Sequence, residues 1–251
     1  MQGFQKAMCD LVASPDLCAL VTRSPDQVFA RYDLSPRDRR RLLDVVQQRG
    51  MFVNCSLYRA NRISPIYNFM PFTCFLLGDT LMSEATEFWK DFEESRLQFN
   101  EEVKRFGDFL RRRIEFGFQT SPILGDVLEY ELALNELRFI SRKDVLSNLE
   151  PNDGHAGRNL RVRLHPLLRL LLFRHEPRRL LELLNERRSP PYEVLVGEFW
   201  LLLDGKGDTL ETKLIDPGVG RLLKAIDSGT QSSLSSDDVK TLRKAGYAVH
   251  V

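Results

Sequence analysis

The spacing of hydrophobic positions changes from a helical period to an alternating one after the first 140 or so residues. Before that point, apolar side chains recur at every third or fourth position, as on the buried face of an amphipathic helix. Three Ser-Pro pairs add helix starts at Ser14, Ser24 and Ser35, because serine can cap free amide groups and proline fits the first helical turn. The pattern predicts helices over 36–49, where Gly50 would end the helix, and over 79–94, 100–116 and 123–140.

The stretch over 51–77 mixes large apolar residues with polar ones and carries two prolines. Buried polar groups need partners, so we expect about half of its polar side chains to form an internal network. The rest have the Tyr, Arg and Asn character expected at a protein interface. The candidate interface residues are Asn54, Tyr58, Arg59, Asn61, Arg62, Tyr67 and Asn68.

The periodicity fails between residues 141 and 157, and NLEPNDGHAG at 148–157 has the composition of a loop. The sequence therefore predicts a helical domain over 1–147, a linker over 148–157 and a second domain over 158–251.

The second domain carries strand and helix patterns in alternation. A hairpin is predicted from strands over 194–203 and 209–215, and the turn between them, DGKGD, has glycines expected to supply positive φ. Residues 159–164 alternate like a half-buried strand, and 170–173 fit either a strand or a helical turn. Helices are expected over 177–188, 217–226 and 236–245, and a last strand over 247–251. The fold class predicted is α+β, with a helical N-terminal domain before a small antiparallel sheet.

Composition narrows the possible partners and compartment. The chain is 43% hydrophobic and 28% charged with a formal charge of +1, so bulk charge gives no reason to expect nucleic acid or an anionic membrane. Its cysteines form no CxxC pair and lie in apolar surroundings, which is typical of reduced thiols. No apolar run approaches the roughly 18 residues that would span a bilayer, and no signal peptide is apparent. We expect a cytoplasmic protein.

The sequence offers little catalytic or metal chemistry. His155, His165 and His175 are ten positions apart, which fits neither helical pairing nor zinc-site spacing. The nucleophile-elbow, P-loop and dinucleotide motifs do not occur. We therefore expect no catalytic residue, no metal site and no cofactor. The segment between His155 and Pro191 contains nine arginines but only three glutamates. This excess of positive charge indicates either a solvated surface or an acidic partner such as a peptide, a protein or DNA.

Four segments carry a resemblance to a known family: YDLSPRDRRRLL at 32–43, NCSLYRANRISPIYNFMPFTC at 54–74, RFGDFLRRRIE at 105–115, and a tail that runs from LRVRLHPLLRLLLF at 160–173 through the hairpin to the end. With these segments the chain resembles the partner proteins of multinuclear non-haem iron oxidative enzymes, which modify ribosomally made peptides. The methanobactin and 3-thiaglutamate pathways contain examples.

The resemblance implies a helical region that docks on the enzyme's TIM-like barrel, followed by a winged-helix-like peptide-recognition element. In such elements the leader of a precursor peptide lies along a sheet edge beside a helix. Iron would belong to the partner enzyme, with which this chain would form a heterodimer. Carried onto this chain, the peptide-binding residues would be Thr209, Glu211, Lys213, Leu214 and Ile215 on the strand, with Val239, Leu242 and Arg243 on the helix. If 159–164 is the exposed strand instead, the leader would lie there.

Two other functions stay open at this point. A winged-helix-like DNA-binding regulator would also have a hairpin beside short helices, although the helix at 236–245 begins with two aspartates where phosphate contact is expected. The third possibility is an enzyme whose site the sequence pattern does not reveal.

Overall fold

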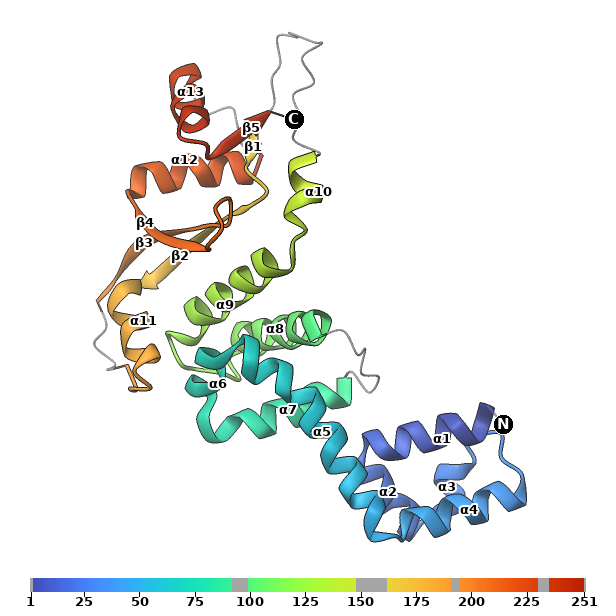
Figure 1. Cartoon of the computed structure of the whole chain (residues 1–251). Helices are drawn as coiled ribbons and strands as arrows, with labels where there is room; N and C mark the ends of the chain where they lie inside the picture. The colour runs from blue at the N-terminus through green and yellow to red at the C-terminus, as the bar shows by residue number, and fades with distance from the viewer. Residues whose placement is uncertain (1, 92–98, 148–161, 191–194, 230–234, 251) are drawn as a thin grey trace. The chain divides into compact units, whose positions relative to one another are not determined.

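The computed structural model describes residues 2–91, 99–147, 162–190, 195–229 and 235–250, and its fold is α+β as expected (Figure 1). The chain forms two compact units, Met1–Leu110 and Arg111–Val251. The predicted linker at 148–157 lies outside the described residues.

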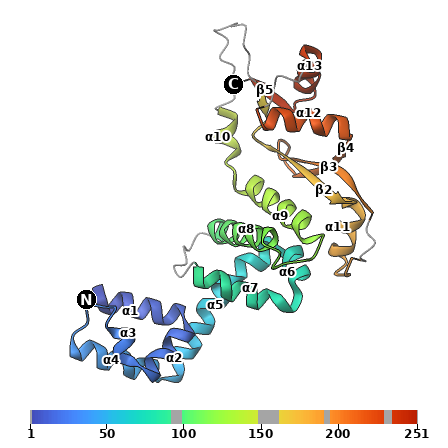
Figure 2. The same cartoon turned by 180° about the vertical axis from the view of Figure 1, so that it is seen from behind.

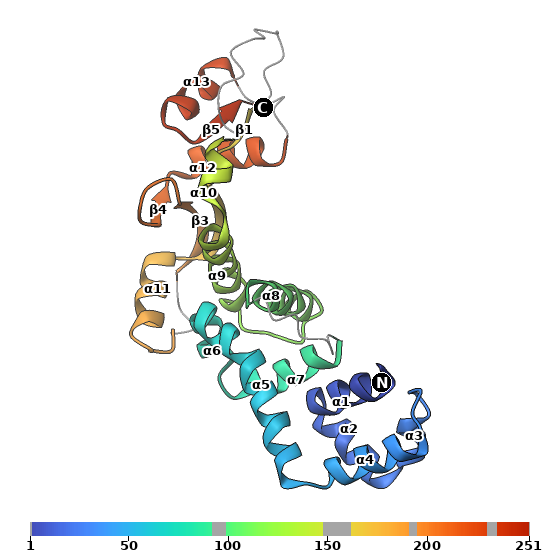
Figure 3. The same ribbon diagram turned by 45° about the vertical axis from the view of Figure 1, so that its right-hand side comes forward.

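Unit 1 begins with short helices that pack beside the N-terminal half of a long one (Figure 3). The three Ser-Pro pairs begin helices as predicted, and the side chains of Ser14 and Ser35 cap two of them. The expected stop at Gly50 is wrong, because the helix there ends at Val46 and Gly50 lies inside the next one. The helices are α1 (Gln2–Ala13), α2 (Pro15–Arg23), α3 (Pro25–Phe29), α4 (Pro36–Val46) and α5 (Arg49–Phe69).

The rest of unit 1 is also helical. Helix α5 continues through Pro65 to Phe69, a length that the mixed sequence at 51–77 did not predict. The predicted helix over 100–116 is confirmed one residue earlier, at Phe99–Glu115. The one predicted over 79–94 is confirmed from Leu81 to Asp91, and residues 92–94 lie outside the described residues. Phe88, Phe106 and Phe109 pack their rings together in the core between them. The elements are α6 (Pro71–Leu77), η1 (Gly78–Thr80), α7 (Leu81–Asp91) and α8 (Phe99–Glu115), whose last turn belongs to unit 2.

All strands among the described residues lie in unit 2. A three-stranded antiparallel sheet has the order β2-β3-β4, and β1 pairs with β5 in a separate antiparallel ribbon. The region 170–173 is strand, not a helical turn. A short helix, α10, forms after residue 141, where the sequence loses its helical periodicity. The elements are α9 (Leu124–Phe139), α10 (Arg142–Ser147), β1 (Val162–Leu164), β2 (Leu168–His175), α11 (Pro177–Asn185), β3 (Val196–Asp204), β4 (Glu211–Ile215), α12 (Pro217–Asp227), α13 (Ser236–Lys244) and β5 (Ala248–His250).

Helices cover both faces of the three-stranded sheet (Figure 2). On one face, Phe173 of β2 is fully buried and its ring meets Tyr130 of α9 edge to face. On the other face, Leu202 of β3 shares a core with residues of α12, α13, β1 and β5. Trp200 packs directly against α12 at Gly220, where a side chain would have no room. The sheet therefore buries both faces and can accept a further strand only at an edge.

Candidate functional site: an open sheet edge and its groove

Strand β4 is an edge strand. Among the described residues it pairs only with β3, in a register that sets Leu214 opposite Leu201 and Glu211 opposite Asp204. Its side chains are mostly exposed, and Leu214 keeps 48% of its surface in contact with solvent. Such an edge presents unpaired N–H and C=O groups that another extended segment can use.

The opposite edge of the same sheet, at β2, is closed by side chains at its two ends. The Asp126 carboxylate of α9 accepts hydrogen bonds from the backbone N–H groups of Arg174 and His175 at 3.0 and 3.1 Å. Its same oxygen lies 2.8 Å from Nδ1 of His175, and both side chains are buried. At the other end of β2, the guanidinium of Arg169 donates to the carbonyl groups of Pro166 and Leu168. Since these backbone groups already have partners, β2 is a poor place for strand addition and β4 is the better one.

A groove lies between α11 and the face of β3 and β4 that α9 also covers. It encloses about 150 Å³. This is well below the roughly 300–1,000 Å³ of small-molecule sites, so it suits a single side chain better than a cofactor. The residues that line it are Pro177, Arg178, Leu181, Leu201, Thr212 and Leu214.

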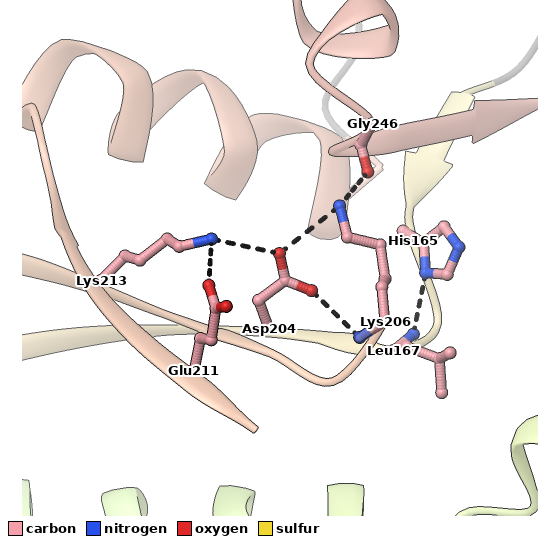
Figure 4. A network of polar contacts seen from close by, with 7 residues as sticks. All are labelled: His165, Leu167, Asp204, Lys206, Glu211, Lys213 and Gly246. Carbon is pink, nitrogen blue, oxygen red and sulfur yellow. Dashed lines mark hydrogen bonds and ion pairs between the residues drawn. The ribbon is translucent and has the colours of Figure 1, made fainter. Parts of the chain in front are cut away.

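The other face of β4 carries an ion-pair network (Figure 4). Lys213 Nζ lies 2.6 Å from Glu211 and 3.7 Å from Asp204, and the bond to Glu211 together with its charge raises the pKa of Lys213. Asp204 also lies 3.5 Å from Nζ of Lys206, which in turn donates to the carbonyl of Gly246 at 2.9 Å. The network ties the β3–β4 turn to the chain just before β5, and it leaves the charges of β4 on this face already paired.

His165 supports the same region from the loop between β1 and β2 (Figure 4). Its Nδ1 accepts a hydrogen bond from the backbone N–H of Leu167 at 3.1 Å, and the backbone N–H of His165 donates to the Tyr247 carbonyl at 2.9 Å. Partial burial lowers the pKa of His165, and the nearby charge of Lys206 lowers it further. A backbone N–H can only donate, so this contact requires an unprotonated Nδ1.

The structure separates the predicted peptide-binding residues into three groups. Glu211, Lys213, Leu214 and Ile215 lie on β4 as expected, whereas Thr209 lies in the turn before it, because the strand begins two residues later than predicted. On α13, Arg243 is exposed, but Leu242 is only 4% exposed and Val239 packs against the same core. Those two side chains contribute to the stability of the core, so little of their surface is left for a guest.

The expectation that the hairpin glycines supply positive φ is wrong. Gly205 and Gly207 are not among the described residues with positive φ, whereas Gly246, after α13, has a φ of 71°. Gly205 instead lies in a close contact: an added Cβ would lie 3.2 Å from the carbonyl oxygen of Leu167, which would have to give way slightly. Its own N–H donates to that carbonyl, so the close approach brings the turn against the β1–β2 loop.

The alternative leader site at 159–164 overlaps β1. Residues Val162–Leu164 form β1, which pairs with β5 along its whole described length. Residues 159–161 lie outside the described part of the chain.

The predicted interface residues on α5 divide between core and surface. Arg62 is only 3% exposed and forms an ion pair of 2.6 Å with Glu102, which is equally buried. The guanidinium of Arg62 also lies over the rings of Tyr58, Phe88 and Trp89. Arg59 is half-buried over the Trp89 ring. The exposed members of the set are Asn54, Asn61, Tyr67 and Asn68.

Apolar residues accompany these exposed polar ones on α5. Phe52, Val53 and Leu57 are each more than half exposed. A helix with apolar residues on more than one side is usually buried on more than one side, so this surface is a candidate for contact with a partner.

Of the six residues that line the groove, sequence reasoning named only Leu214 as a peptide-binding residue. Thr212 could have been found, because it alternates with the predicted Glu211 and Lys213 along the strand. Arg178 belonged to the arginine-rich segment, but its place beside β4 depends on how α11 packs. Nothing local in the sequence indicates that Pro177 and Leu181 face the edge strand.

Within the described ranges, no group of three or more His, Cys, Asp or Glu side chains is arranged to hold a metal ion. None of the described helices is both long and apolar enough to cross a membrane. No protein-family model matches this chain, and no curated protein matches it significantly.

Proposed function

We propose that this chain is a non-catalytic partner subunit that binds the leader of a ribosomally made precursor peptide and presents its core to an iron-dependent oxidative enzyme. In this proposal β2–β4 with α12 and α13 form a winged-helix-like peptide-recognition element. The observation that supports it most is the contrast between the two edges of one sheet: side chains close β2, whereas β4 is open beside a groove.

Strand addition suits such a role because the peptide's main chain supplies most of the contacts. The hydrogen bonds fix register without demanding a particular sequence, and the groove selects among side chains. Binding a leader also raises the effective concentration of the attached core at an enzyme held in the same complex. No catalytic side chain of this chain is needed.

The α5 surface is the proposed docking site for the enzyme. Exposed Tyr67 and Asn68, together with apolar Phe52 and Leu57, have the mixed character of protein interfaces. Iron would be held by that enzyme.

The start of α13 counts against a DNA-binding function. Asp238 is part of a capping box with Ser235, and Asp237 is exposed beside it. Their negative charge occupies the helix end that would approach a phosphate.

Hydrogen–deuterium exchange of the full chain tests the proposal, with and without a precursor peptide from the same gene neighbourhood. The peptide is expected to slow exchange at β4 by about tenfold or more, because its carbonyls would accept hydrogen bonds from the outward N–H groups. Exchange at β2, whose edge is closed, should not change. A bound peptide that leaves β4 exchange unaltered would contradict strand addition at this edge.

Two proline variants make the test more specific. Successive N–H groups along a strand point to opposite sides, so Lys213→Pro and Leu214→Pro differ in which N–H they remove. One variant loses a backbone hydrogen bond to β3, and the other loses only an N–H group that points away from β3 toward the open edge. The variant with the better preserved thermal stability should still lose peptide affinity by about tenfold. Unchanged affinity in that variant would argue against β4 as the binding edge.

A further inference from the structure

We infer that the peptide recognised at β4 carries an aliphatic side chain and an acidic side chain two positions apart, both on the face toward α11. This inference rests on the proposed function, since it specifies the ligand of the same edge. It depends on three observations: the size and lining of the groove, an arginine at its rim that has no ionic partner among the described residues, and the spacing that an extended strand imposes.

The groove selects an apolar side chain of moderate size. Its floor is the buried Leu201, and its walls include Leu181 and the exposed Leu214. A guest strand beside β4 would direct every second side chain toward this face. With about 150 Å³ available, one leucine, isoleucine, valine or methionine side chain fits and would cover Leu214, removing apolar surface from water.

Arg178 provides the preference for an acidic residue. It lines the groove, it is exposed, and among the described residues its guanidinium has no ion-pair or hydrogen-bond partner. The nearby Glu176 carboxylate accepts from the backbone N–H groups of Arg178 and Arg179 instead, as the cap of α11. A guanidinium beside a strand edge, with no partner in the described part of the chain, favours a carboxylate, which it can bind through two parallel hydrogen bonds.

The spacing follows from strand geometry. Side chains on one face of a strand are two residues apart, or roughly 6.6 Å. An aliphatic residue in the groove therefore places the residues two positions before and after it on the same face, where the long side chain of Arg178 can reach one of them. On the opposite face, Lys213 is already paired with Glu211 and Asp204, so that face adds little charge preference.

Selection from a displayed library of random dodecapeptides on the full chain tests the inference. The same selection is carried out on Arg178→Glu and on a matched control, Arg179→Glu. Arg179 is the exposed neighbour that pairs with Glu182 and does not line the groove. Both substitutions reverse one charge on the same surface turn of α11, so a difference between them reports the groove alone.

The wild-type chain and the Arg179→Glu variant should both select peptides with an aliphatic residue two positions from Asp or Glu. Those peptides should bind the Arg178→Glu variant about tenfold to hundredfold more weakly, and that variant should select Lys or Arg at the same spacing. The inference would be overturned by any of three results. The selected peptides lack this pair, no peptide is selected, or both variants lose the same peptide affinity.

Amide exchange separates this inference from the proposed function. Selected peptides that lack the aliphatic–acidic pair yet slow exchange at β4 would overturn the side-chain preference and leave strand addition intact. Peptides that bind without slowing exchange at β4 would contradict the proposed function itself.

Discussion

At the scale of single residues, polar side chains in apolar sequence are explained by the partners that the fold brings to them. Arg62 interrupts the apolar stretch at 51–77, yet its partner Glu102 lies forty positions away on α8. Removing one member of such a buried pair leaves a charge without compensation, which is usually far more destabilising than losing a surface ion pair. Arg62 is therefore expected to stabilise unit 1, which leaves the exposed members of the set for contact with a partner.

His165 gives a pH-dependent prediction. Its pKa in the folded chain is lowered from the usual 6.5, so the unfolded chain binds more protons as the pH falls through 6.5. The folded state should therefore lose stability below pH 6.5 and keep its full contribution from this residue above it. His165→Asn places an amide oxygen where Nδ1 accepts from Leu167 but cannot titrate. Thermal melts at pH 7.5 and 5.5 should show a smaller fall for the variant, and parallel curves would show that His165 has no part in the pH dependence.

At the scale of elements, the contact of α12 with β3 depends on one missing side chain. A Cβ at Gly220 would lie 2.2 Å from Cγ of Trp200 and 2.7 Å from its Cβ, so the whole residue would have to move. Trp200 is only 5% exposed and its Nε1 donates to Glu198 at 2.7 Å, which restricts its freedom to move. The small residue therefore sets the distance between the helix and the sheet.

Gly220→Ala is expected to destabilise the chain by about 1–3 kcal/mol, because α12 or Trp200 must shift. Gly125→Ala is the matched control: it also lies in a helix of unit 2, and its Cβ would meet nothing within 4 Å. The control should be neutral or stabilising by up to about 1 kcal/mol. Urea unfolding of both variants measures the difference, and equal stabilities would show that the close packing is not required.

The same scale shows how far sequence could predict this molecule. Ser-Pro pairs and apolar periodicity located most helices and the hairpin, because those signals act within a few residues. The length of α5 was not predicted, because Pro65 and its polar neighbours resemble a break unless the partner Glu102 is known. The sequence located the edge strand β4, and its role in binding stays a prediction. That β2 is closed by Asp126 from α9, and that Leu242 lies in the core, depend on contacts between distant segments.

At the scale of the whole molecule, the chain has two compact units, and the proposal gives each a different task. Unit 2 contains the open edge and the groove. Unit 1 contains the exposed residues of α5. Such a division would let one protein hold a peptide and an enzyme at separate surfaces.

Co-expression with an iron-dependent oxidative enzyme of this kind should yield a stable pair, and Leu57→Asp should reduce its recovery about tenfold, because a charge in an apolar interface is costly. Met82→Asp is the matched control, since Met82 is similarly exposed but lies on α7. Copurification followed by size-exclusion chromatography measures the yield of the pair. Equal recovery of both variants would remove α5 as the docking surface, and failure to copurify the native pair would contradict the proposed partner.

An unoccupied β4 also has a consequence for the protein on its own. Two copies could join edge to edge through this strand, which is how fibrous aggregates start. The strand is only five residues long and carries Glu211 and Lys213 among its exposed positions. A short, charged edge strand pairs poorly with another copy of itself. The length and charges of β4 therefore oppose aggregation while its edge stays available to a peptide.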